Sequence, residues 1–576
     1  MGAEKLQGSE DLHSRTPQAE ARQNALSTLG LALLAFASRA VGLGNGLVFD
    51  DYFTIAHRGA APWIEVLRGF VTDRSQMFGS NFYRPVLIFW DELVFRVFGR
   101  EAWGWHLASI LLHVLCTLLV FRVANAVLRK RSVAWVAAAL FAVHPAHVEA
   151  VAWASAMGDL LMAAFLLLSA VALLEWKKSG RTIWYAASLL AAACCLGSKE
   201  PGVMLPVVLA ACVWASPAGK AKKIAVPLVP FFALSVVFLI VRRMVLPAFS
   251  HHLNPSTSGS MAATWPAALL FYLQHMFWPP VVVPFYPVQI VQSWQSSGFF
   301  LPLLIVAAVV AVLGYLLRRA AGARGVCFCV AWFALLAPAL YLKVFAPYEL
   351  VHDRFLYAPL IGFCMALTVI LRWATAGIEA RTGSNVYLLV SIALMAAWGF
   401  QTMNETVWWR NNLTIFTHNV AYAPDNPKAL VKLGDAYVEA RRYDDAVPLF
   451  QRALAHDPQS ANAMFGLGMM AWRVGDDEQA ESYLAQALRI DPRYDEWAFL
   501  ARAELHRKKF DAAEQAARQA VALSSTGLGA HLVLGQVLDA RGDRVGAVRE
   551  FQEELRFNPE NEEARAALAR VTNAGN

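Results

Sequence analysis

Long apolar runs alternate with short polar turns from about Ala25 to Met403, and beyond Asn404 the chain becomes charged and rich in alanine. Each run approaches the roughly 20 residues that a membrane-spanning helix needs. The pattern predicts an all-α protein with a polytopic transmembrane module followed by a helical domain outside the bilayer. About eleven spans are expected, over residues 26–44, 103–123, 133–152, 158–175, 183–198, 201–216, 224–246, 299–317, 325–344, 355–373 and 386–403.

Two further apolar stretches, 85–98 and 264–280, are interpreted as in-plane or re-entrant helices. Asp91 and Glu92 within the first of them favour an in-plane helix over a buried span. Residues 1–24 are polar and predict a disordered cytoplasmic N-terminus. The run after them has no small-residue cleavage site, which indicates a retained helix and not a signal peptide.

Basic residues collect in the short turns between apolar runs, where the positive-inside rule places cytoplasmic lysine and arginine. The net charge of +7 therefore reports membrane topology and not a nucleic-acid partner. With a cytoplasmic N-terminus, the first long loop (45–100) and the C-terminal domain share the extracytoplasmic side, which is the periplasm for a bacterial inner-membrane protein. The basic turns are 129–131, 176–181, 220–223, 318–324 and 372–381.

Prolines recur at 34-residue spacing after the boundary, at Pro424, Pro458 and Pro492, and Pro559 continues the series. This period, with Leu-Gly, Ala and Phe at fixed offsets, predicts tetratricopeptide repeats that stack into an α-solenoid. Such stacks form concave surfaces that bind protein segments, or they can brace a neighbouring domain. A linker (404–423) precedes the repeat domain (424–576), whose repeats are expected at about 425–458, 459–492, 493–525 and 526–559.

Asp50 and Asp51 follow directly on the first expected span. A carboxylate at the lip of a membrane helix can act as a general base toward a hydroxyl group while it stays in contact with water. A neighbouring like charge raises the pKa of one member of such a pair. The simpler reading, that of solvated loop residues, remains open for an isolated Asp-Asp pair.

Further motifs extend along the chain in order. They are Asn81-Phe82-Tyr83-Arg84-Pro85, His144-Pro145-Ala146-His147-Val148-Glu149-Ala150-Val151-Ala152-Trp153, Gly158-Asp159, Ser198-Lys199-Glu200 with Gly202, Trp278-Pro279 with Tyr286-Pro287, and Asp353-Arg354-Phe355-Leu356-Tyr357. With the early Phe49-Asp50-Asp51, this succession resembles membrane glycosyltransferases of the GT-C fold. It is most similar to the TMTC-type O-mannosyltransferases and their bacterial relatives, which join a GT-C module to tetratricopeptide repeats.

The resemblance implies transfer of a monosaccharide, with mannose favoured, from a polyprenyl-phosphate donor to a hydroxyl acceptor such as protein Ser/Thr, outside the cytoplasm. It also implies inversion at the anomeric carbon, with an acidic residue of the first loop near the acceptor. By this analogy the base is Asp50 or Asp51, with a slight preference for Asp50. The implied partners are membrane lipid, the lipid-linked sugar, and an acceptor protein or glycan that the repeat groove can present; no cofactor is implied, and a divalent metal remains an open question.

A leaving lipid phosphate needs cations at the membrane surface. Arg354, Lys199 and Arg84 are the outward-facing cations nearest to span ends, and they are the candidates for donor-phosphate binding. An arginine offers phosphate a bidentate fork and a lysine a point charge. The alternative is that Lys199 pairs with Glu200 and Arg354 with Asp353.

The remaining motif residues are expected to shape the pocket: Glu200, His144, His147, Glu149, Asp159, Asp353, Tyr357 and Tyr83. A metal set of His144, His147 and Glu149 is disfavoured, because Pro145 interrupts the helix and no third ligand at zinc-type spacing is evident. His113, inside an apolar helix, is expected to be a buried, hydrogen-bonded residue. The rival function is a non-enzymatic membrane scaffold whose repeats assemble a periplasmic complex.

Overall fold

The computed structural model describes residues 17–56, 60, 62–72, 82–216, 225–246, 256–524 and 527–573. The described residues form helices and connecting segments and no β-strand. The chain divides into two compact units, Met1–Ile415 and Phe416–Asn576, which we call the membrane unit and the repeat unit. The expected linker (404–423) is itself mostly helical, because α15 continues to Trp408 and α16 occupies Asn412–Tyr422.

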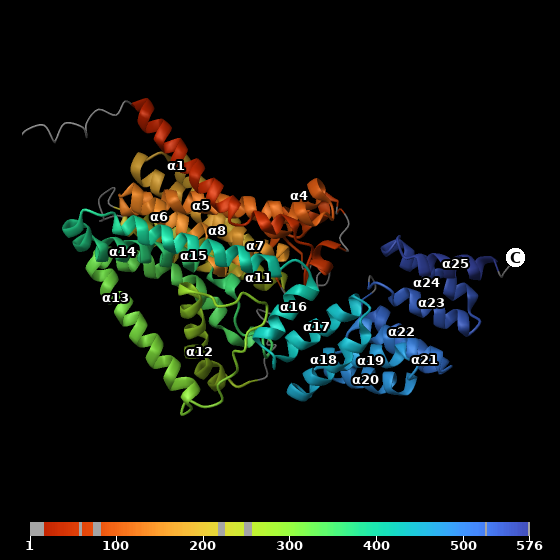
Figure 1. Cartoon of the computed structure of the whole chain (residues 1–576). Helices are drawn as coiled ribbons and strands as arrows, with labels where there is room; N and C mark the ends of the chain where they lie inside the picture. The colour runs from red at the N-terminus through yellow and green to blue at the C-terminus, as the bar shows by residue number, and fades with distance from the viewer. Residues whose placement is uncertain are drawn as a thin grey trace, which may run out of the picture. The chain divides into compact units, whose positions relative to one another are not determined.

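The membrane unit is a bundle of long apolar helices joined by short helical turns (Figure 1). Its α-helices are α1 Pro17–Ala37, α2 Trp63–Arg68, α4 Pro85–Phe98, α5 Ala102–Leu128, α6 Arg131–Ala142, α7 Val148–Ala152, α8 Met157–Ser179, α9 Thr182–Ser198, α10 Leu205–Ala215, α11 Ala225–Val245, α12 Ser258–Phe277, α13 Ser297–Ala331, α14 Pro359–Thr382 and α15 Val386–Trp408. The turns that bear on the site are η1 Ala40–Gly44, η4 Ala154–Ala156, η5 Glu200–Met204, η7 Trp332–Leu340 and η9 Asp353–Leu356.

Six helical segments among the described residues are long and apolar enough to cross a membrane, and the bent pair Arg131–Ala142 and Pro145–Ala152 would make a seventh. Three shorter apolar helices occupy further expected ranges. Every expected range therefore contains an apolar helix, but the number of eleven spans stays a prediction. Neither α4 nor α12, which cover the two stretches expected not to span, is among the candidate spans.

Two boundaries differ from expectation at the N-terminus. Residues 17–24, predicted to be disordered, form the first turns of α1, which begins at Pro17. The apolar helix also ends at Ala37, before the expected position 44, because the chain tightens into η1 there. Arg39 lies between the two elements; its guanidinium is buried and donates to His144 O at 2.8 Å.

Helices α5 and α8 form the buried centre of the unit, where α5 packs against α1, α6 and α8. In contrast, only 6% of the most apolar window of Ser297–Leu340 is buried. In Figure 1, α13 lies near α14 at one end and is inclined away from the rest of the bundle toward its other end. A helix that is apolar all round and exposed in the folded chain is typical of contact with lipid. Its path breaks at Gly322, where φ is +67°, inside the turn expected at 318–324.

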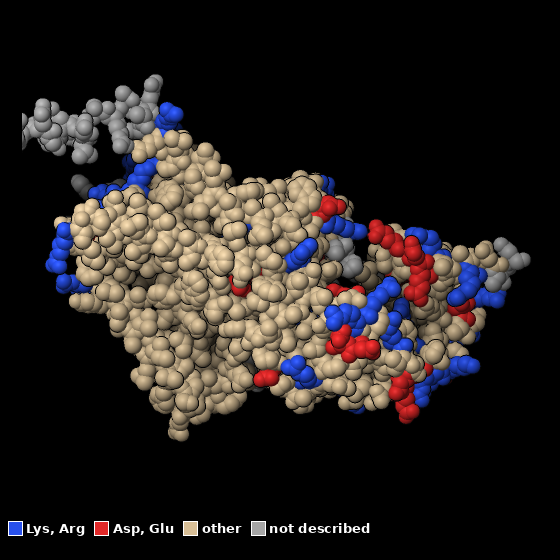
Figure 2. All heavy atoms as spheres, in the orientation of Figure 1, with Lys and Arg blue, Asp and Glu red and all other residues tan. Residues whose placement is uncertain are grey.

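The repeat unit consists of antiparallel helix pairs. Glycine positions bring the two helices of a pair together: a Cβ on Gly434 would lie 2.6 Å from the Phe450 ring, and one on Gly535 would lie 2.5 Å from the Phe551 ring. Figure 2 shows charged side chains concentrated over the repeats, while most of the visible membrane unit is free of them. The repeat helices are α17 Pro427–Glu439, α18 Tyr443–His456, α19 Ala461–Arg473, α20 Asp477–Ile490, α21 Tyr494–His506, α22 Phe510–Leu523, α23 Ala530–Ala540, α24 Arg544–Phe557 and α25 Glu562–Asn573.

Candidate active site

The loop that carries the two aspartates is held by the segment after α15. Gly46 N donates to Arg410 O at 2.9 Å, and Phe49 N donates to Asn412 Oδ1 at 2.8 Å. Phe49 adopts a left-handed conformation, with φ of +53°, and this turns the chain immediately before the carboxylates. Asp50 is exposed and Asp51 is fully buried, so adjacent residues present their carboxylates to different environments.

Both oxygens of Asp51 accept hydrogen bonds. Oδ1 accepts from Ser155 N at 2.8 Å and from Ser155 Oγ at 2.5 Å, and Oδ2 accepts from Val48 N at 3.1 Å. Burial raises the pKa of Asp51 to about 6 against the opposing effect of these hydrogen bonds, and the charge of Asp50 adds a smaller increase. The side chain of Asp51 therefore fixes the loop to Ser155.

Ser155 belongs to a short segment, residues 149–159, that contacts several predicted site residues in turn. It runs through α7, an extended Trp153 and η4 into the first turn of α8. Glu149 binds Arg354, Ser155 binds Asp51, and Asp159 binds Lys199. We call it the 149–159 segment. The sequence did not indicate Ser155, because a serine in an apolar context carries no recognisable pattern.

Each candidate phosphate-binding cation has a carboxylate partner, although not always the expected one. Lys199 pairs with Asp159 and not with Glu200. Arg354 pairs with Glu149 and not with Asp353, and Arg354 N also donates to Glu149 Oε2 at 2.9 Å. Burial lowers the pKa of Lys199 to about 8, although Asp159 raises it, and the cations Arg84 and Arg354 lower it further.

The third cation, Arg84, makes a bidentate contact with Glu200, which lies next to Lys199 in the chain. Arg84 Nη2 is 2.7 Å and Nε is 3.0 Å from Glu200 Oε2. Contacts between Arg84 and Glu200, 116 residues apart, bring α4 to the start of η5. The alternative that Lys199 pairs with Glu200 and Arg354 with Asp353 is therefore wrong about the partners. All three cations are nevertheless paired with a carboxylate.

Aromatic rings connect the aspartate loop with the cations. The Trp153 ring lies 5.4 Å from the Phe49 ring, and the Arg354 guanidinium carbon lies 4.8 Å from the Trp153 ring centroid. Phe355 lies between the two cations, with the Arg354 guanidinium carbon 5.1 Å and the Lys199 ammonium 5.4 Å from its ring centroid. A chain of aromatic contacts thus connects Phe49 of the first loop with Arg354 and Lys199.

Asp353 forms a second buried network beside Arg354. Asp353 Oδ1 is 2.6 Å from His275 Nδ1, and Asp353 Oδ2 accepts a hydrogen bond from the Tyr286 hydroxyl. His275 is a further residue that the sequence did not indicate, since it lies in α12 within an apolar stretch. Phe285, next to Tyr286, lies 5.8 Å from the Phe49 ring, so the segment after α12 also borders the aspartate loop.

The other predicted pocket residues have structural contacts. Tyr83 OH donates to Phe70 O at 2.7 Å, and the Tyr357 hydroxyl lies 2.9 Å from His113 Nδ1 in the core. His113 is buried and hydrogen-bonded, as expected. His144 Nε2 lies 2.9 Å from Met276 O, and His147 is fully buried among aromatic rings. Asn81 lies outside the described residues.

A group of three or more metal-ligating side chains with suitable geometry does not occur within the described part of the chain. His144 accepts a hydrogen bond from Ala146 N through Nδ1, and Glu149 is engaged by Arg354. His144 and Glu149, two of the three residues of the metal set that the sequence disfavoured, are therefore engaged in other contacts.

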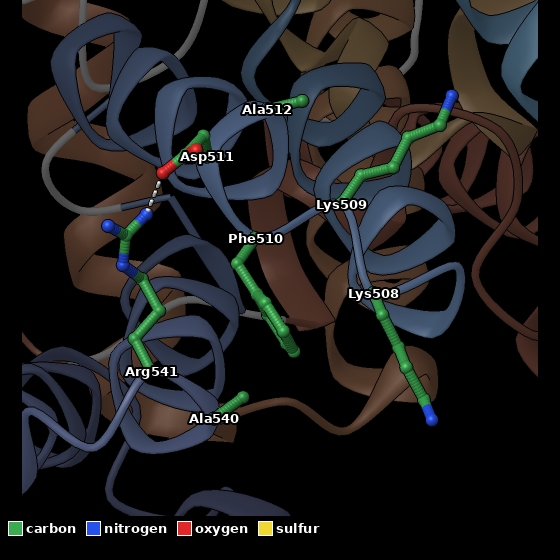
Figure 3. Close-up of a pocket in the computed structure, with 7 residues that line it drawn as sticks. All are labelled: Lys508, Lys509, Phe510, Asp511, Ala512, Ala540 and Arg541. Carbon is green, nitrogen blue, oxygen red and sulfur yellow. Dashed lines mark hydrogen bonds and ion pairs between the residues drawn. The ribbon is translucent and has the colours of Figure 1, made fainter.

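An open pocket of about 640 Å³ lies on the repeat unit (Figure 3). Figure 3 shows Phe510 at its centre, between Arg541 and the two lysines. Arg541 is 2.5 Å from Asp511, and Lys509 is 2.7 Å from Glu481, so carboxylates neutralise most of its positive charge. This pocket lacks the carboxylate and cation groups predicted from the sequence, which all lie in the membrane unit. It is lined by Lys508, Lys509, Phe510, Asp511, Ala512, Ala540 and Arg541.

The class of protein that this fold defines is a membrane protein with a GT-C-like module and tetratricopeptide repeats. A family model described as "Dolichyl-phosphate-mannose-protein mannosyltransferase" matches residues 84–246, and a tetratricopeptide repeat model matches residues 431–495. The first match includes Arg84, the 149–159 segment and Lys199.

Curated relatives give the more specific likeness. The chain is 26% identical to the Drosophila melanogaster protein O-mannosyl-transferase Tmtc1, in an alignment that covers 76% of this chain and 62% of that protein. It is 24% identical to the Caenorhabditis elegans protein O-mannosyl-transferase F38B6.6, covering 79% of this chain and 66% of that protein. It is 35% identical to the Drosophila melanogaster protein O-mannosyl-transferase Tmtc2, in a shorter alignment that covers 31% of this chain and 20% of that protein. The chain is TMTC-like, as its motifs predicted, and spans less than two thirds of the length of these relatives.

Proposed function

We propose that the chain is an inverting membrane glycosyltransferase. It moves a monosaccharide, with mannose favoured, from a polyprenyl-phosphate donor to a hydroxyl acceptor. The favoured acceptor is a Ser or Thr side chain of a protein. The observation that carries the proposal is the meeting of Asp51, Lys199 and Arg354 around the 149–159 segment, although they come from distant parts of the sequence. The names of the relatives support the choice of mannose and of a protein acceptor.

In this proposal the reaction occurs on the extracytoplasmic side, which is the periplasmic face of the inner membrane in a bacterium. The polyprenyl tail stays in lipid, and the sugar enters the water-accessible region beside Asp50. The repeat unit selects or presents the acceptor, in keeping with the protein-binding surfaces that such repeats form.

Asp50 is the proposed base. Its carboxylate takes the proton of the acceptor hydroxyl while the acceptor oxygen forms a bond to the anomeric carbon. The bond between the anomeric carbon and the phosphate oxygen breaks, and its electron pair leaves with the polyprenyl phosphate. Attack on the face opposite the leaving group inverts the anomeric carbon.

Asp51 is the positioning residue in this scheme, because burial and three hydrogen bonds keep its oxygens from an acceptor. Arg354 and Lys199 stabilise the negative charge that develops on the leaving phosphate. Their carboxylate partners do not prevent this, since a guanidinium has five N–H donors and an ammonium has three.

The test is transfer of labelled sugar from a lipid-linked donor by the full-length protein in reconstituted membranes. Asp50→Asn is expected to lower the rate by at least about 100-fold, and Asp51→Asn by about tenfold through the loss of a charged hydrogen-bond acceptor. Glu65→Gln is the control, because Glu65 is a carboxylate of the same loop that pairs with Arg68 at the surface. Full activity of Asp50→Asn would exclude the proposed base. Absence of transfer by the wild type, with a cellular function that is lost only on removal of the repeats, would favour the scaffold.

A further inference from the structure

Helix α11 ends in two arginines with opposite environments. Arg242 is buried, whereas its neighbour Arg243 is exposed. One face of this helix exposes large apolar residues, as expected for a wall that faces lipid: Val226, Val229, Phe232, Val236, Val237, Ile240 and Met244. An arginine held inside the protein at the end of such a helix is a candidate functional residue by position, because charge at membrane depth is costly.

Packing brings Arg242 to the candidate phosphate-binding residues. Phe238, one helical turn before Arg242 and therefore on the same face of α11, lies with its ring 5.8 Å from the ring of Tyr83. Phe238 and Tyr83 belong to one buried cluster with Leu196 and Leu246. Arg84 follows Tyr83 directly. The cluster therefore brings the C-terminal end of α11 close to Tyr83 and Arg84, which precede α4.

The Glu200 carboxylate binds one of the two arginines and lies near the other. Arg84 binds Glu200 through two nitrogens, and Glu200 also attracts the guanidinium of Arg242. Arg84 and Arg242 repel each other. Lys199, which pairs with Asp159, directly precedes Glu200 in the chain, so three cations gather near this carboxylate. Such a group of cations is a suitable place for a phosphate group.

We infer that Arg242 binds the phosphate of the lipid-linked donor together with Arg84, and that the isoprenoid tail lies along the exposed face of α11. Glu200 attracts both guanidinium groups and so keeps them near one place, where a phosphate can bind both. The inference rests on the proposed function, because it assumes a lipid phosphate as substrate. It adds a binding residue, and a path for the lipid, that the motifs did not contain.

The experiment measures binding of radiolabelled farnesyl phosphate, a short isoprenyl monophosphate, to the purified full-length protein in detergent. Farnesol serves as the probe without phosphate, and inorganic phosphate and phosphatidylglycerol as competitors without the isoprenyl chain. Arg242→Gln is expected to weaken binding of farnesyl phosphate by about 10- to 100-fold, the value of one hydrogen-bonded ion contact. Arg243→Gln, the matched change at the exposed neighbour, is expected to leave the Kd unchanged.

The comparison between the two probes separates contact from structural damage. In the wild type, farnesyl phosphate should bind much more tightly than farnesol, and this difference should largely disappear in Arg242→Gln while the affinity for farnesol stays the same. If the glutamine variant does not fold, Arg242→Lys replaces it. That change keeps the charge and removes the fork, and it is expected to weaken binding about tenfold.

The possible failures are distinguishable. A folded Arg242 variant that binds farnesyl phosphate as tightly as the wild type overturns the role of Arg242 and leaves the proposed function in place. Absence of farnesyl phosphate binding by the wild type overturns the inference and the lipid-phosphate donor together. Equal competition by inorganic phosphate or phosphatidylglycerol shows that the site does not recognise an isoprenyl chain and overturns the proposed path along α11.

Discussion

At the scale of single residues, Ser155 links the two halves of the candidate site. Its backbone and its hydroxyl both bind Asp51, and the hydroxyl also lies 2.7 Å from Thr54 Oγ1. Four residues later, Asp159 binds Lys199. A small displacement of Ser155 would therefore move the aspartate loop relative to the cations, and catalysis is sensitive to displacements of this kind.

Removal of this hydroxyl should affect catalysis more than folding. Ser155→Ala is expected to lower kcat by about tenfold, because Asp51 loses one hydrogen bond to a charged group. Ser155→Thr, which keeps the hydroxyl, should retain most of the activity. Ser169→Ala is the control, since Ser169 is also hydrogen-bonded but is buried in the helical core, where it contacts Ser188. Equal losses for Ser155→Ala and Ser169→Ala in the transfer assay would argue against a specific role.

Lys199 makes the candidate site dependent on pH. Because burial lowers the pKa of Lys199 to about 8, its ammonium loses the proton as the pH rises above that value. We expect kcat/KM to fall above pH 8, by about tenfold per unit at most. An arginine stays charged throughout this range.

Lys199→Arg should therefore move the alkaline limb of the profile to higher pH, even if the rate at pH 7 is lower. The measurement is the transfer rate between pH 6 and 10 for the wild type, Lys199→Arg and Lys178→Arg. Lys178 is exposed in the last turn of α8, so its variant should keep the profile of the wild type. An unchanged alkaline limb in Lys199→Arg would assign that limb to another group.

At the scale of helices, α14 depends on one glycine. A Cβ on Gly362 would lie 2.4 Å from Cys329 O and 2.8 Å from Trp332 Cβ, so α14 approaches the end of α13 and the start of η7 with no space for a side chain. The obstacle includes backbone, which cannot turn away as a flexible side chain would. Arg354 lies just before α14, and this packing therefore also fixes the position of a candidate site residue.

Gly362→Ala is expected to destabilise the folded chain by about 1–3 kcal/mol, as in other overpacked cores. Gly377→Ala, on the same helix, places the methyl group in open space and should be neutral or slightly stabilising. The measurement is the midpoint of thermal unfolding of the detergent-purified chain. Similar midpoints for the two variants would show that the close approach at Gly362 can relax.

Helices were largely predictable from the sequence, and their ends were less so. The eleven expected ranges all contain apolar helices, because runs of apolar residues without charge have few other solutions. The end of α1 at Ala37 was not predictable from the apolar run, and neither was the contact of Arg39, just after it, with the carbonyl of His144, 105 residues away. The same holds for the ion partners: neighbours in sequence suggested Glu200 and Asp353, whereas Lys199 and Arg354 bind Asp159 and Glu149 across the fold.

At the scale of the whole molecule, the aspartate loop and the segment after α12 must lie on one side of the membrane, because Phe285 packs against Phe49 within the membrane unit. The charge pattern places the turn between α14 and α15 on the other side, since it follows the basic stretch 372–381. Ser293 and Ser384 are exposed residues in these two places and suit a test of membrane topology.

Single cysteines at these positions should react differently with a membrane-impermeant maleimide. In intact cells, Ser293→Cys is expected to be labelled and Ser384→Cys to react only after permeabilisation. The background carries Cys327→Ser, because Cys327 is exposed whereas the other native cysteines are buried or half-buried. The reverse pattern would place Asp50 and the cations in the cytoplasm, where a sugar carried outward on a polyprenyl phosphate is out of reach. The proposed donor would then have to be abandoned even if both aspartates proved essential.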